Sequence, residues 1–173
     1  MQFHPSYAYE DFFEGFRPRQ AKDASGTVGF ELVPGPLRQL ADTAREDRQH
    51  PYVLVIDEVN RANLAKVFGE LYFLLEYRDQ AVALQYSPDS QFTLPDNLYL
   101  LATMNTADRS IALVDAAMRR RFYFIPFFPG SEPIRGLLRR WLQARELPAG
   151  PADLLDALNR RMARRTSQSA PPT

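Results

Sequence analysis

The stretch Tyr52-Val53-Leu54-Val55-Ile56-Asp57-Glu58 decides the fold class of this chain. Its first five residues form an apolar run rich in β-branched side chains, a pattern typical of a parallel strand buried on both faces between helix layers. The run ends at two adjacent carboxylates, and apolar residues then recur at helical spacing from residue 64 to 75. A strand, two acids and a helix predict an α/β fold, in which ligands bind at the carboxyl ends of the strands. The alternative explanation for the acids is a helix N-terminus, whose dipole favours them.

A second strand and several helices follow from the same kind of pattern. Residues 98–104 predict another apolar strand, which ends in polar residues beginning with Asn105. Residues 122–127 predict a third strand, placed at a sheet edge or strand end by Pro126, which has no N–H to donate. The other predicted elements are a short helix at 9–13, hairpins within 17–35 and 82–94, and helices at 36–49, 63–77, 115–121 (capped by Asp115), 133–145 and 151–165.

The first 20 residues are unusually aromatic for the start of a chain. Six aromatic side chains occur in this span, namely Phe3, Tyr7, Tyr9, Phe12, Phe13 and Phe16. Such density belongs in a core or an interface rather than in a frayed end. The beginning of the sequence therefore resembles the middle of a domain.

Composition excludes several classes of protein. The chain has 173 residues, enough for one domain or one domain with part of another, and no cysteine for disulfides or thiolate metal sites. No apolar run approaches the ~20 residues of a membrane helix, and no secretory signal is visible, so we expect a cytoplasmic protein without a membrane partner. The net charge is zero, although residues 135–165 hold eight Arg against three acidic residues. This local excess indicates a solvated helix face or, alternatively, contact with nucleic acid or an acidic partner.

The two strand ends carry the groups that nucleotide hydrolysis requires. Asp57 is a candidate ligand for Mg²⁺, which prefers carboxylate oxygens, and Glu58 is a candidate for orienting or deprotonating the attacking water. Asn105, a neutral amide, can hold that water or the terminal phosphate without repelling it. Arg119 and Arg120 are candidates for stabilising charge on the phosphoryl oxygens. Taken singly, Asn105 could only cap a turn, and the arginines could be the charged end of a helix.

The sequence resembles the AAA+ family, in particular its McrB type. Val55–Asn63, with Asn-Arg-Ala after the acids, is similar to the Walker B segment of that type. Met104–Ser110 resembles its sensor segment, Leu113–Phe122 its arginine-finger helix, and Phe3–Phe12 a further stretch of these proteins. The resemblance covers about residues 2–128 and makes two residues within these motifs, Asn60 and Asp108, candidates for nucleotide binding.

This resemblance implies a three-layer P-loop NTPase (AAA+) core with a parallel sheet at residues 1–130, part of a helical lid at 131–165, and a disordered tail at 166–173. It also implies ATP or GTP as substrate, Mg²⁺ as cofactor, and a hexameric ring in which arginines complete the neighbouring site. A nuclease subunit would be the partner in restriction of modified DNA, which other domains would bind.

One motif of the family is missing from this sequence. Nothing matches G-x-x-x-x-G-K-[ST], the loop that cradles phosphates, and lysine occurs only at Lys22 and Lys66. We therefore expect a core without its first strand and Walker A helix, whose absent strand would lie between residues 98–104 and 122–127. Such a sheet has a gap or two unpaired hydrophobic strand edges, so we expect a poorly stable chain or a partner that supplies the strand. Whether the chain is an enzyme stays open, and the alternatives are a non-hydrolysing protein- or DNA-interaction module and an inactive truncated product.

Overall fold

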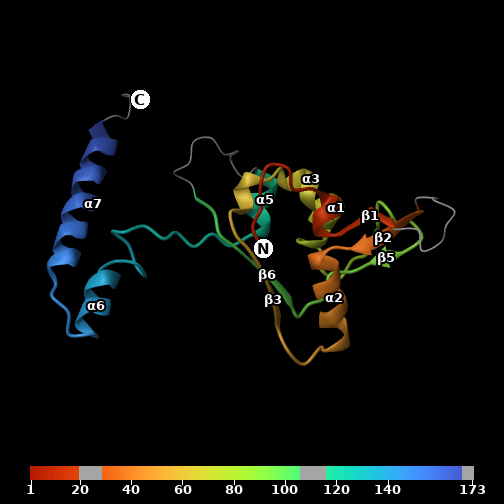
Figure 1. Cartoon of the computed structure of the whole chain (residues 1–173), viewed down its shortest axis with the longest axis horizontal. Helices are drawn as coiled ribbons and strands as arrows, with labels where there is room; N and C mark the ends of the chain where they lie inside the picture. Colours follow the sequence, from red (N-terminus) through yellow and green to blue (C-terminus); the bar gives the residue numbers. More distant parts are fainter. Residues whose placement is uncertain (20–28, 106–115, 169–173) are drawn as a thin grey trace. The chain divides into compact units, whose positions relative to one another are not determined.

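The computed structural model describes residues 1–19, 29–105 and 116–168. The chain forms two compact units, residues 1–122 and residues 123–173 (Figure 1). The first unit holds both predicted central strands and the aromatic N-terminal segment, so it contains the candidate site.

The centre of the first unit is a pair of parallel strands, which confirms the two predicted apolar strands. β3 (Tyr52–Ile56) pairs with β6 (Leu98–Ala102), with Tyr52 opposite Leu98 (Figure 1). Gln2 forms an isolated parallel bridge with Asp57, just beyond the end of β3. The carboxyl ends of β3 and β6 therefore lie at the same edge, as the sequence predicts.

Among the described residues of the first unit, one face of this strand pair is covered and the other is about half exposed, so the prediction of burial on both faces is wrong. Ile56 and Leu98 are fully buried in the core, which α2 (Pro36–Glu46) helps to form. Alternate residues point the other way, and four of them are about half exposed: Val53 (51%), Val55 (48%), Tyr99 (55%) and Leu101 (57%). The described residues of the first unit therefore leave this second face partly uncovered. The apolar run has the composition of a doubly covered strand, but the described residues of the first unit supply one covering layer.

The predicted helix at 63–77 is interrupted. It forms α3 (Leu64–Phe68) and α4 (Leu71–Leu74), preceded by a 3₁₀ turn, η1 (Val59–Arg61). The break lies at Gly69, whose φ of +50° suits glycine and which approaches the ring of Tyr9. The apolar residues at helical spacing are buried, namely Leu64, Val67, Phe68, Leu71 and Leu74, whereas Phe73 is 42% exposed, so the periodicity correctly identified the inward face.

The first unit also contains two hairpins and a short N-terminal helix. α1 (Tyr9–Phe12) leads into β1 (Glu14–Arg19), which pairs antiparallel with β2 (Gly29–Pro34). The predicted hairpin thus begins at Glu14, earlier than expected. β4 (Val82–Ala83) pairs with β5 (Gln91–Phe92) and confirms the second hairpin. Four of the six N-terminal aromatic residues enter the core, and Tyr7 packs against it, whereas Phe16 is 52% exposed. Within the core, Phe12 lies 5.0 Å from Phe68, centroid to centroid.

The C-terminal predictions are only partly correct. α5 (Ala116–Arg121) confirms the helix predicted there, while Asp115, its expected cap, lies outside the described residues. Residues 122–127 form no strand: Tyr123 and Ile125 are exposed, because no described strand lies beside them to accept the ladder. In the second unit, α6 (Leu137–Gln143) is shorter than predicted. α7 (Gly150–Gln168) extends three residues into the predicted tail.

Candidate functional site

The two strand ends are tied together through Thr103, one residue beyond β6. The Thr103 hydroxyl donates a hydrogen bond to Oδ1 of Asp57 and accepts one from the Glu58 N–H at 3.3 Å. Thr103 N–H donates to the Ile56 carbonyl and the Val59 N–H donates to the Thr103 carbonyl, both at 2.9 Å. The structure therefore brings the predicted acid pair to the carboxyl end of β6, just before the sensor segment.

Glu58 has an unusual backbone and a partly sheltered carboxylate. Its φ of 55° and ψ of 43° lie in the left-handed region, which costs a non-glycine residue roughly 1–2 kcal/mol. Its Oε2 is buried and accepts no hydrogen bond from the described residues, although Nε of Arg61 lies at ion-pair distance, 3.4 Å away. Strained residues of this kind concentrate at functional sites.

Asn60 joins the turn after the acids to the sensor segment. Its side chain is only 6% exposed, and Nδ2 donates a 3.2 Å hydrogen bond to the Asn105 carbonyl. Its Oδ1 is buried without a hydrogen-bond donor. The contact brings Asn105 to the predicted site, as expected, but through its backbone.

The oxygens at this edge fit a hard divalent cation. Asp57 uses Oδ1 for the Thr103 hydroxyl, while Glu58 Oε2 and Asn60 Oδ1 are buried acceptors without donors. No cluster of three or more His, Cys, Asp or Glu occurs among the residues the structure describes. Such a donor set suits Mg²⁺, which proteins commonly hold through one or two carboxylates together with water and substrate phosphates, better than a metal that needs a full protein cage.

The three consecutive arginines of α5 differ in their surroundings. Arg121 forms a 2.8 Å ion pair with Glu76, and its guanidinium lies 5.0 Å from the Tyr72 ring centroid. Arg119 and Arg120, the two predicted to act on phosphate, are exposed. Arg121 therefore anchors the helix, and its two neighbours present their side chains to solvent.

Sequence reasoning found part of this site and missed part of it. Asp57, Glu58, Asn60 and Asn105 come together, whereas Asp108 lies outside the described residues. The role of Thr103 was missed, and the only available signal was a hydroxyl residue at the end of an apolar strand, two positions before the predicted amide.

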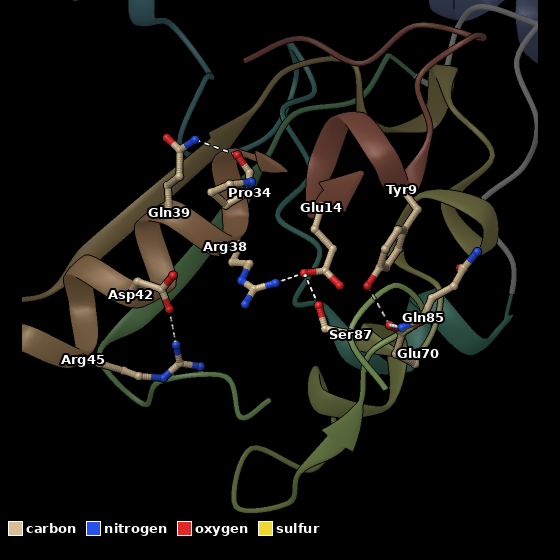
Figure 2. Close-up of polar contacts among 10 residues, drawn as sticks. All are labelled: Tyr9, Glu14, Pro34, Arg38, Gln39, Asp42, Arg45, Glu70, Gln85 and Ser87. Carbon is tan, nitrogen blue, oxygen red and sulfur yellow. Dashed lines mark hydrogen bonds and ion pairs between the residues drawn. The ribbon is translucent and has the colours of Figure 1, made fainter. Parts of the chain in front are cut away.

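A second polar cluster, which lies among α1, β1, α2 and the segment between β4 and β5, was also missed. Glu14 is fully buried, pairs with Arg38 and accepts a 3.4 Å hydrogen bond from the Ser87 hydroxyl (Figure 2). Oε1 of Glu70 accepts from the Tyr9 hydroxyl at 2.7 Å and from the Gln85 N–H at 3.0 Å (Figure 2).

These contacts fasten the segment between β4 and β5 to α1, β1 and α2. Burial, and then the hydrogen bond to Glu70, raise the pKa of Tyr9 far above its ordinary value. The neighbouring Tyr86 hydroxyl donates to Glu10 at 2.5 Å and lowers the pKa of that carboxyl. The cluster is a scaffold for the core rather than a part of the strand-end site.

Comparison with known proteins identifies the family. The family model described as AAA domain (dynein-related subfamily) matches residues 1–122, the extent of the first compact unit. The chain belongs to this AAA family. This AAA membership and the parallel strand pair agree with the expected P-loop NTPase fold.

Two relatives narrow the identification. The chain is 45% identical to the type IV methyl-directed restriction enzyme EcoKMcrB subunit of Escherichia coli K12, over 76% of this chain and 28% of that protein. It is 28% identical to the type II restriction enzyme BsuMI component YdiS of Bacillus subtilis 168, over 72% of this chain and 46% of the relative. The AAA protein described here is thus McrB-like, and it spans less than half the length of either relative.

The solved structure of a protein described as an ATPase from Cytophaga hutchinsonii superposes on this AAA protein with a TM-score of 0.45. The two sequences are 24% identical, and the match covers 70% of this chain and 30% of that one. In the part of the chain that the structure describes, no helix is both long and apolar enough to cross a membrane.

Proposed function

We propose that this chain is the distal part of a McrB-type AAA+ nucleoside-triphosphatase, which hydrolyses ATP or GTP and serves the restriction of modified DNA. The observation that carries the proposal is the meeting of Asp57, Glu58, Asn60 and Asn105 at one edge of the parallel strand pair. The printed names of both relatives, each a component of a restriction enzyme, support the cellular role.

Each residue has a distinct task in this proposal. Glu58 accepts a proton from the attacking water or orients it, and Asn105 holds that water or the terminal phosphate. Asp57 is the candidate ligand for Mg²⁺, which when bound supplies positive charge at the phosphates. Asn60 supports Asn105 through its 3.2 Å hydrogen bond and is a candidate contact for nucleotide or cation. Asp108, in the sensor motif, is proposed as a further nucleotide contact on the family resemblance alone.

Ring assembly completes the site. Arg119 and Arg120 are exposed on α5, and we assign them, on the family resemblance, to the nucleotide held by a neighbouring subunit. We propose a homo-oligomeric ring, a hexamer as in the family, with residues 131–165 as part of the helical lid, a nuclease subunit as partner, and DNA bound by other domains.

The decisive test asks whether Glu58 is needed for turnover. The chain is fused behind a strand, a G-x-x-x-x-G-K-[ST] loop and a helix of the AAA+ type, so that a phosphate-binding loop is present, and ATP and GTP hydrolysis are measured with Mg²⁺. Glu58→Gln should abolish turnover and leave nucleotide binding largely intact. Glu31→Gln, an exposed carboxylate on β2, should be without effect. Normal turnover by Glu58→Gln would remove Glu58 from its role.

A second candidate function is a non-hydrolysing interaction module. It is favoured by the lack of a G-x-x-x-x-G-K-[ST] loop in this sequence and by the apolar sheet face that the described residues leave open. Titration of the chain itself with ATP and GTP in the presence of Mg²⁺ separates the two candidates, because phosphate contacts supply much of the nucleotide affinity. A dissociation constant for ATP or GTP below about 1 mM would favour the nucleoside-triphosphatase.

A further inference from the structure

Thr103 contacts four consecutive residues at the end of β3. Its backbone pairs with Ile56 and Val59, and its hydroxyl pairs with the two residues between them, Asp57 and Glu58. The backbone contacts belong to any continuing parallel ladder. The hydroxyl contacts depend on the side chain, and they reach both acids at once.

The two hydroxyl contacts restrict the side chain of Asp57 and the backbone of Glu58. The bond to Oδ1 restricts the Asp57 side-chain torsions and leaves its second oxygen for another partner. The bond from the Glu58 N–H holds a residue whose φ of 55° is intrinsically unfavourable. We propose that Thr103 is a positioning residue, which sets the geometry of Asp57 and Glu58 for cation and water; its catalytic meaning rests on the function proposed above.

The exposure of Thr103 separates this role from a merely structural one. Because Thr103 lies at a solvent-exposed strand end, water competes for its hydrogen bonds, and their loss should change the stability of the chain little. Restriction of the two acids, by contrast, disappears with the hydroxyl. Thr103→Val keeps the β-branched shape and removes both contacts, whereas Thr103→Ser keeps the hydroxyl.

The test uses NMR on the full chain without nucleotide. Wild type, Thr103→Val, Thr103→Ser and Thr43→Val are compared; Thr43, an exposed residue of α2, loses an unrelated hydroxyl bond to the Gln39 carbonyl. In Thr103→Val the Glu58 amide should exchange with solvent about 2- to 12-fold faster, the span of one net hydrogen bond. The three-bond couplings to the Asp57 carboxyl carbon should change from the values of a single side-chain rotamer to values averaged over several rotamers. Thr103→Ser and Thr43→Val should resemble wild type.

A second measurement, titration with Mn²⁺ alone, connects the geometry to the site. Broadening of the Glu58 and Asn105 amides should need severalfold more Mn²⁺ in Thr103→Val than in wild type, with Thr103→Ser restoring the wild-type response. Equal Asp57 couplings and Glu58 exchange in all four proteins would overturn the proposal, as would unchanged Mn²⁺ response in Thr103→Val. If wild type itself shows no broadening, the cation role in the proposed function fails, while the couplings and exchange rates still decide whether Thr103 sets the geometry of the acids.

Discussion

Two variants, one on each face of the central strand pair, test whether one face is open. Val55→Thr combined with Leu101→Thr changes a cross-strand pair whose members are 48% and 57% exposed. Full burial of a Val or Leu side chain contributes about 1.5–3 kcal/mol, so two half-exposed residues contribute at most about 1.5–3 kcal/mol together. Threonine keeps β-branching and recovers part of this, so the free energy of unfolding should fall by less than about 1.5 kcal/mol.

The matched change on the covered face is Leu98→Thr. Leu98 is fully buried, so its replacement leaves a cavity and places a hydroxyl in the core. The expected loss is at least about 3 kcal/mol, although only one residue changes. Urea unfolding followed by far-ultraviolet circular dichroism at low micromolar concentration measures both variants.

Association supplies the second readout. An open apolar face promotes self-association, so sedimentation velocity should show a larger monomer fraction for the Val55/Leu101 double variant than for wild type. A double variant that loses as much stability as Leu98→Thr would refute the reasoning, because it would mean that Val55 and Leu101 are covered in solution. A cooperative, monomeric thermal melt of wild type would refute the expectation that the isolated chain is poorly stable.

Three further changes test the scaffold around the site. Glu14→Gln leaves the arginine partner of a fully buried carboxylate unpaired and should lower stability by about 2–4 kcal/mol in urea unfolding. Gly35→Ala places a Cβ 2.6 Å from the backbone at the end of α1 and should cost about 1–3 kcal/mol in the same assay, whereas Gly130→Ala, with nothing within 4 Å, should cost little. The hydrogen bond from the Tyr86 hydroxyl lowers the pKa of Glu10. The stability that this bond contributes is therefore fully present above the ordinary carboxyl pKa of about 4.3 and is lost as the pH falls below that value through the lowered pKa. Tyr86→Phe should destabilise the protein at pH 7 and converge with wild type in acid.

The predictions from sequence succeeded where a pattern reports local chemistry. The two apolar runs became β3 and β6, parallel and in register, and the segment after the acids contacts the backbone of Asn105 at the same edge. These features depend on side-chain type and on the geometry shared by parallel strands, both of which are readable in one dimension.

The failures share a different cause, which is dependence on neighbours. Residues 122–127 have strand-forming side chains but no described strand beside them. β3 has the composition for two covering layers, but the described residues of the first unit cover one face. The break at Gly69 reflects its packing against Tyr9, 60 positions away. The hydroxyl contacts of Thr103 join residues about 45 positions apart, and nothing in the spacing of the sequence announces them.

The open sheet face and the β6 edge lead to a last prediction. Among the described residues, β6 pairs only with β3, and its other edge carries no strand. We propose that a strand along this edge, followed by a helix across Val55 and Leu101, completes the sheet. A family-derived strand–loop–helix segment fused before Met1 should slow amide exchange along β6 and raise the unfolding midpoint. The gain should be smaller in the Val55/Leu101 double variant, whose apolar contacts with the helix are reduced. A fusion that binds nucleotide without protecting the β6 amides would show that the segment packs elsewhere and would refute this placement.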